Sequence, residues 1–170
     1  GIWKIEKRLD NVIDYTTNIE KTINSDYGKD SYYDLHNVID YVEADYKTEK
    51  QFYVSGVNCN PKTALEEMTI TKEQYGKTGG ILGYHAFQSF AEGEVTPEQC
   101  HAIGVKLAEE MWGDRFEVIV STHLDTDNIH NHFLLNSTSF VDGKRYCNTY
   151  NDIQNMRNIS DELCREHNLS

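Results

Sequence analysis

The stretch FEVIVSTHLDTDNIHNHFLLNSTSF, residues 116–140, predicts two antiparallel strands joined by a short loop. Apolar side chains recur along residues 116–123 and again along residues 130–140, as expected for strands with a buried face. The six residues between them, 124–129, form a loop of hairpin length. This hairpin favours a sheet in which neighbouring strands run antiparallel.

A helix preceding the hairpin has the clearest start signal in the chain. Thr96 can cap it, Pro97 fits its first turn, and Gln99 completes a capping box. Apolar residues then recur at helical spacing on one face: Cys100, Ile103, Leu107 and Met111. We therefore predict a helix that begins after Thr96 and ends near Trp112.

Other segments complete an α/β (α+β) pattern. Strands are predicted at residues 2–7, 51–58 and 81–90, and further helices at 61–75 and 150–167. The element order predicts a single domain over residues 1–170, with a central, largely antiparallel sheet and helices packed on one face.

A near-repeat lies in the N-terminal third. The pentapeptide NVIDY at residues 11–15 recurs at residues 37–41, a spacing of 26 residues, and each copy runs on to a Lys-Thr pair. Two copies indicate a local duplication rather than a solenoid. We predict two short helical segments, 9–22 and 35–48, that carry Tyr15 and Tyr41 near their C-terminal ends.

The composition indicates an ordinary globular protein. Of the 170 residues, 38% are hydrophobic and 26% are charged, which argues against disorder. No run of 18 apolar residues occurs, so we expect no membrane partner and a cytoplasmic location. The four cysteines form no C-x-x-C pair, which argues against a zinc knuckle.

The net charge of -12 argues against a nucleic-acid partner, because phosphate contacts normally require a basic surface. Net charge does not fix the electric field at a cleft, however, and a bound divalent cation changes the local sign. Basic segments can also lie beyond Ser170.

Three of the seven histidines fall within ten residues, at His123, His130 and His132. His130 and His132 point to the same side of a strand because side chains alternate. A regular hairpin places His123 opposite His130 on that face. Three converging imidazoles with open coordination positions are typical of a catalytic metal site. Asp125 is placed to accept the remaining N–H of one histidine.

The alternative interpretation is a group of surface histidines at a hairpin end, which would be the simpler explanation for a single histidine. For a metal site, imidazoles suit manganese, zinc or other transition ions, whereas magnesium prefers oxygen ligands. The residues therefore predict a divalent ion without naming it.

The pattern H-x-D-x-x-x-x-H-x-H resembles the third motif of the conjugative relaxase, or mobilisation nuclease, family within the His-hydrophobe-His endonuclease superfamily. Residues 84–94 and 52–59 are similar to the family at the same order and spacing. The resemblance covers nearly the whole chain and implies a relaxase-like palm fold. One departure is Asn131, where the superfamily usually has a hydrophobe. The letters His-Asn-His do not indicate an HNH nuclease, whose motif residues are dispersed.

This resemblance implies that His123, His130 and His132 hold one divalent ion, Mn²⁺ or Mg²⁺. It also implies nicking of one DNA strand at the origin of transfer of a plasmid or conjugative element, by a tyrosine that forms a 5′-phosphotyrosine intermediate and later rejoins the strand. Either Tyr41 or Tyr15 matches the motif of the nucleophile, with a slight preference for Tyr41. Further domains beyond residue 170 are expected.

Other residues have weaker assignments. Glu94 is a candidate for the carboxylate that helps to deprotonate the tyrosine, although an acid in a turn before a helix is an equally good interpretation. Candidates for substrate binding are His85, Asn136, Lys144 and Arg145. Phe87 could stack on a base, but core packing is the expectation for it. The implied partners are single-stranded or hairpin DNA, accessory relaxosome proteins and a coupling protein.

Two other functions are considered. A rolling-circle replication initiator, or another metal-dependent phosphodiesterase, would share the histidines and tyrosine, but an initiator usually has its tyrosine after the histidines. A non-catalytic interaction domain with a structural ion would normally have a fourth protein ligand, and no cysteine lies near the histidines in the sequence.

Overall fold

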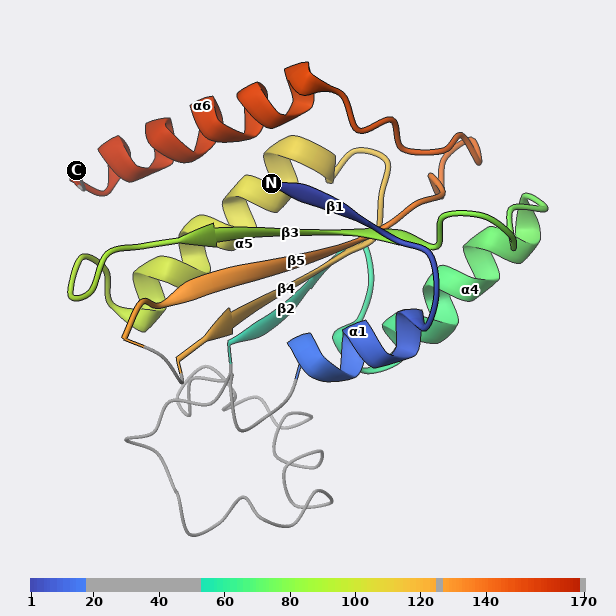
Figure 1. Cartoon of the computed structure of the whole chain (residues 1–170), viewed down its shortest axis with the longest axis horizontal. Helices are drawn as coiled ribbons and strands as arrows, with labels where there is room; N and C mark the ends of the chain where they lie inside the picture. The colour runs from blue at the N-terminus through green and yellow to red at the C-terminus, as the bar shows by residue number, and fades with distance from the viewer. Residues whose placement is uncertain (18–52, 125–126, 169–170) are drawn as a thin grey trace, which may run out of the picture.

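A five-stranded sheet forms the centre of the computed structural model, which describes residues 1–17, 53–124 and 127–168 (Figure 1). The strands are β1 (Ile2–Ile5), β2 (Val54–Val57), β3 (Gly83–Ser89), β4 (Val118–His123) and β5 (His130–Asn136). Their order across the sheet is β1-β3-β5-β4-β2, and every neighbouring pair is antiparallel. The predicted fold class is therefore confirmed.

Strands β4 and β5 form the predicted hairpin. Their register runs from the pair Val118 and Leu135 to the pair His123 and His130, without a bulge. The expectation that His123 lies opposite His130 is confirmed. Since β5 is central, it pairs with β3 on its other side, where Phe87 lies opposite His132.

Helices cover both faces of the sheet, so the prediction of helices on one face is wrong. On one side α5 (Pro97–Trp112) packs on the sheet and α6 (Tyr150–Glu166) packs on α5. On the other side lie α1 (Leu9–Thr16), the short 3-10 helix η2 (Pro61–Thr63) and α4 (Ala64–Gln74) (Figure 1).

The physical reason is that β4 and β5 are apolar on both faces, a property of strands that are buried on both sides. Phe133 and Leu135 face α5 in the larger core, whereas Leu134 faces α1 and α4. The smaller core consists of seven buried residues: Ile5, Leu9, Ile13, Ala64, Met68, Ile119 and Leu134.

The helix boundaries follow their capping residues. Thr96 and Gln99 form the predicted capping box at the start of α5. Asn60 accepts a hydrogen bond from the backbone N–H of Lys62 at 3.0 Å, but the first turn after it is the 3-10 helix η2 and α4 begins one turn later.

Among the described residues, no helix combines the length and apolar character needed to cross a membrane.

The first copy of the near-repeat forms α1, and Tyr15 lies at its C-terminal end. The second copy, which carries Tyr41, lies outside the described residues, as does Asp125. Because α1 and α4 cover the Leu134 end of the sheet, the histidine end of the same face is left to polar and aromatic side chains.

Candidate metal centre

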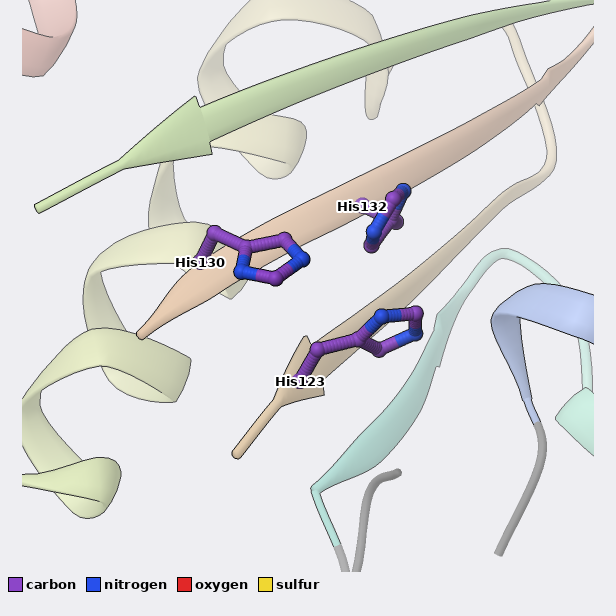
Figure 2. A group of neighbouring side chains, drawn as sticks. All are labelled: His123, His130 and His132. Carbon is purple, nitrogen blue, oxygen red and sulfur yellow. The ribbon is translucent and has the colours of Figure 1, made fainter. Parts of the chain in front are cut away.

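The three histidines converge at the loop end of the β4–β5 hairpin (Figure 2). His123 ends β4, while His130 begins β5 and His132 follows two residues later on the same face. The ring centroids are 4.0 Å apart for His123 and His132, 5.1 Å for His123 and His130, and 4.9 Å for His130 and His132. One ring nitrogen from each lies within 4.8 Å of the others.

Hydrogen bonds fix the tautomers of two of these rings. The Nε2–H of His123 donates to the carbonyl oxygen of Thr16 at 2.9 Å, which leaves the lone pair on Nδ1. The Nδ1–H of His130 donates to the carbonyl oxygen of Asn128 at 2.9 Å, which leaves the lone pair on Nε2. Metal-binding histidines commonly donate their other N–H to a carbonyl in this way. The donor set therefore fits a divalent transition ion.

A fourth imidazole, that of His85 in β3, extends the cluster. Its ring stacks on that of His132 at 4.9 Å and 23°, and a 2.7 Å hydrogen bond joins His85 Nε2 to His132 Nδ1. Burial, and to a lesser degree the nearby His123, lowers the pKa of His85 below its ordinary value. The structure thus brings His85, a candidate for substrate binding, into direct contact with a candidate ligand.

Tyr15 lies beside the histidines. Its ring is 5.9 Å from that of His123 and 6.2 Å from that of His132, in edge-on orientations, and 54% of its surface is exposed. His123 donates a hydrogen bond to the carbonyl of Thr16, the residue after Tyr15. This bond holds the C-terminal end of α1 beside the three histidines. Tyr41 and Asp125 lie outside the described residues.

Glu94 lies in the turn between β3 and α5. Its carboxylate accepts a hydrogen bond from the backbone N–H of Ala91 at 2.9 Å. Burial, and to a lesser degree the charge of Glu94, raises the pKa of Cys164 in α6. These contacts are those of a turn residue on the α5 and α6 side, and the role of general base stays a prediction.

Asn136 lies at the other end of β5, where its side chain is fully buried. Its amide group donates to Glu117 at 2.9 Å and to the carbonyl of Met68 at 3.3 Å, and it accepts from Lys72. Burial lowers the pKa of Lys72 to about 8 and raises that of Glu117. The structure does not bring Asn136 to the histidines.

Lys144 and Arg145 belong to the loop beyond β5, also away from the histidine end. Arg145 donates to the carbonyl of Gly79 at 3.1 Å, and the backbone N–H of Lys144 donates to Asp142 at 3.0 Å. Phosphate binding by these two residues stays a prediction, and it would have to occur at the opposite end of the sheet from the metal centre.

Asn131, the departure from the His-hydrophobe-His pattern, points to the other face and is fully buried. Its amide nitrogen donates to the carbonyl of Cys100 at 2.8 Å and to Gln88 at 3.1 Å, and its oxygen accepts from the hydroxyl of Thr122 at 2.6 Å. With its hydrogen bonds satisfied, an amide can occupy a position that is usually apolar.

Sequence reasoning missed the carbonyl partners of His123 and His130, because backbone groups leave no mark in a sequence. It assigned His85 to the substrate, because the contact with His132 depends on the pairing of β3 with β5, which no local pattern in the sequence reveals. It also missed Trp3, whose ring stacks on that of Phe87 at 5.1 Å. Phe87 itself is 43% exposed, so the expectation of core packing is wrong.

Comparisons with known proteins agree on one family. The family model described as "Relaxase: MobA/VirD2-like, nuclease domain" matches residues 17–169. The chain is 42% identical over 116 residues to a protein rlx of Staphylococcus aureus, a match that covers 68% of this chain and 35% of the relative. It is 32% identical over 166 residues to the group II intron-interrupted relaxase LtrB of Lactococcus lactis subsp. cremoris, covering 82% of this chain and 29% of that protein. The chain thus spans about a third of the length of these relatives.

Proposed function

The chain belongs to the MobA/VirD2-like relaxase nuclease family, and we propose that it nicks one strand of plasmid or conjugative-element DNA at an origin of transfer in a metal-dependent reaction. The observation that carries this proposal is the position of Tyr15 beside three convergent histidines. The substrate is single-stranded or hairpin DNA, and accessory relaxosome proteins and a coupling protein would act with the whole protein.

His123, His130 and His132 would hold one divalent ion, with Mn²⁺ a better match than Mg²⁺ to three imidazoles. When bound there, such an ion would polarise a phosphoryl oxygen and stabilise the charge that develops during in-line displacement. The carbonyls of Thr16 and Asn128, together with His85, hold the three rings in position.

Tyr15 is the proposed nucleophile. Its phenolic oxygen attacks the phosphorus, the bond from phosphorus to the 3′ oxygen breaks, and the phenolic proton is finally carried by the free 3′-hydroxyl. The 5′-phosphotyrosine keeps the energy of the phosphodiester, so the reverse reaction rejoins the strand. The family match begins at residue 17, so this assignment is supported by the distances from Tyr15 to the histidines.

Covalent adduct formation tests the proposal. Labelled single-stranded oligonucleotides spanning candidate nick sites are incubated with the protein and Mn²⁺, Mg²⁺ or a chelator, and the products are separated by denaturing electrophoresis. We expect a metal-dependent adduct that Tyr15→Phe and His130→Ala abolish and that Tyr41→Phe retains. His167→Ala, at the C-terminal end of α6 on the other side of the sheet (Figure 1), is the matched histidine control.

The other outcomes are informative. An adduct that maps to Tyr41 would reject Tyr15 as the nucleophile and leave the relaxase function standing. Cleavage without an adduct would indicate a hydrolytic phosphodiesterase on the same metal centre. Bound metal without cleavage of any oligonucleotide would favour a non-catalytic interaction domain.

A further inference from the structure

An exposed pair of aromatic rings lies next to the metal centre. Trp3 of β1 and Phe87 of β3 stack with their centroids 5.1 Å apart and their planes 14° from parallel. Trp3 is 49% exposed and Phe87 is 43% exposed. Among the described residues, neither ring belongs to the two hydrophobic cores, so the packing of that part of the chain does not account for the pair.

The pair occupies the same sheet face as the histidines. Trp3 lies opposite His85 in the register of β1 and β3, and Phe87 lies opposite His132 in the register of β3 and β5. The rings of Phe87 and His132 are 6.2 Å apart. The strands β1, β3 and β5 are neighbours in the sheet (Figure 1), so Trp3, Phe87 and His132 come from adjacent strands on one face.

We propose that Trp3 and Phe87 form a base-stacking subsite for one unpaired nucleotide next to the phosphate that is cleaved. This inference rests on the proposed function, since that function places a DNA strand at the histidines. It adds the chemistry that would hold that strand: every base has a flat π face, and stacking on an aromatic ring contributes to binding with little sequence preference.

A nucleotide matches this surface better than a protein segment does. The exposed area is formed by two stacked rings, and it lies next to His132, where a phosphate beside the stacked base would lie. A strongly acidic chain, with net charge -12, also gains relatively little affinity from general attraction to phosphates, so contacts to bases matter more. A base can reach Trp3 only when it is out of a duplex stack, so the subsite selects unpaired DNA.

Tryptophan fluorescence provides a direct measurement. The chain has two tryptophans, and Trp112 is 1% exposed in the core, so a base that stacks on indole can quench only Trp3. The probe is a single-stranded oligodeoxythymidine of about 12 nucleotides, added at low ionic strength without a divalent ion. Anisotropy of the labelled probe measures affinity in parallel.

We expect the wild-type protein to be quenched by the single strand and not by a duplex of equal length. Trp3→Phe should remove the quenching while the affinity is largely retained, because an aromatic face remains. The double variant Trp3→Ala, Phe87→Ala should weaken binding by about tenfold or more. Tyr150→Ala, which removes an aromatic ring that is 74% exposed at the start of α6, is the matched control and should change neither readout.

Three outcomes would overturn the inference. Binding of the single strand without quenching of the wild-type protein would show that no base stacks on Trp3. Unchanged affinity and unchanged adduct formation in the double alanine variant would reject the subsite and leave the proposed function intact. Failure of every single-stranded probe to bind the wild-type protein would reject both the subsite and the proposed function.

The variant Phe87→Tyr controls for misfolding. It keeps an aromatic ring at residue 87, so it should bind the single strand as the wild type does if the alanine variants act through stacking rather than through folding.

Discussion

The side chain of Asn131 occupies the space next to Gly104 of α5. A Cβ atom on residue 104 would lie 2.5 Å from the amide nitrogen of Asn131 and 2.7 Å from its Cγ, so only glycine allows this approach. The amide is held there by Thr122, Gln88 and the carbonyl of Cys100. Since Asn131 separates His130 from His132 in β5, the contact also fixes the strand that carries two candidate metal ligands.

The first prediction is that Gly104→Ala destabilises the protein. The new methyl group forces apart α5 and β5 in a fully buried region, and overpacking of this kind costs about 1–3 kcal/mol in the free energy of unfolding. Chemical denaturation measures the change. Gly79→Ala is the control, because a Cβ at Gly79 meets nothing within 4 Å. Equal stability of the two variants would show that the Asn131 amide moves aside without cost.

The residues that make the hairpin explain why its histidines could be placed from the sequence. Alternation and a six-residue loop determine which side chains share a face, and the His123–His130 pairing follows from them. The capping box of Thr96 and Gln99 is similarly local. Each of these features depends on residues that are close together in the sequence, so no tertiary information is needed.

Features that depend on distant segments could not be derived. Leu134 is apolar like its neighbours Phe133 and Leu135, so the sequence shows that β5 is buried but not that a second layer of helices covers it. The contact between Asn131 and Gly104 joins two elements that are unrelated in sequence pattern. The stacking of Trp3 on Phe87 likewise requires knowing that β1 pairs with β3.

Asn136 is predicted to contribute to stability rather than to DNA binding. Asn136→Ala leaves the buried groups of Lys72 and Glu117 without the amide that bridges them, which should lower the free energy of unfolding by about 2–4 kcal/mol. The affinity for a single-stranded oligonucleotide should stay within about twofold at a temperature where the variant is folded. Asn155→Ala, on the exposed side of α6, is the control. A large loss of DNA affinity with unchanged stability would instead support the role in substrate binding.

His101 predicts a specific pH dependence of stability. Its Nδ1–H must donate to Thr122, because the Thr122 hydroxyl donates to Asn131, so Nε2 accepts from Ser55 at 2.6 Å. Burial lowers the pKa of His101 from 6.5 to about 4. Between these values the unfolded chain binds a proton that the folded protein does not, so stability falls as the pH is lowered from 6.5 to 4, by about 2–3 kcal/mol in total.

Comparison with His101→Gln isolates this contribution. Glutamine can hydrogen-bond to Ser55 and Thr122 but does not titrate, whereas the carboxylates titrate alike in both proteins. The difference in unfolding free energy between wild type and variant should therefore shrink or reverse as the pH falls from 7 to 4.5. Parallel pH profiles would mean that folding leaves the pKa of His101 unchanged.

His85 is predicted to set metal affinity without being a ligand. Its hydrogen bond to Nδ1 of His132 and its stacking on that ring restrict how the imidazole turns toward His123 and His130. His85→Ala should weaken Mn²⁺ binding by about 10–100-fold, the usual effect of losing a group that orients a ligand. His130→Ala should remove measurable binding altogether, and His167→Ala should leave it unchanged. Titration calorimetry on all three variants distinguishes a ligand from an orienting residue. The variant His85→Gln can restore the hydrogen bond but not the stacking, so partial recovery of Mn²⁺ affinity would separate these two contributions. Wild-type affinity in His85→Ala would show instead that His132 needs no partner in β3.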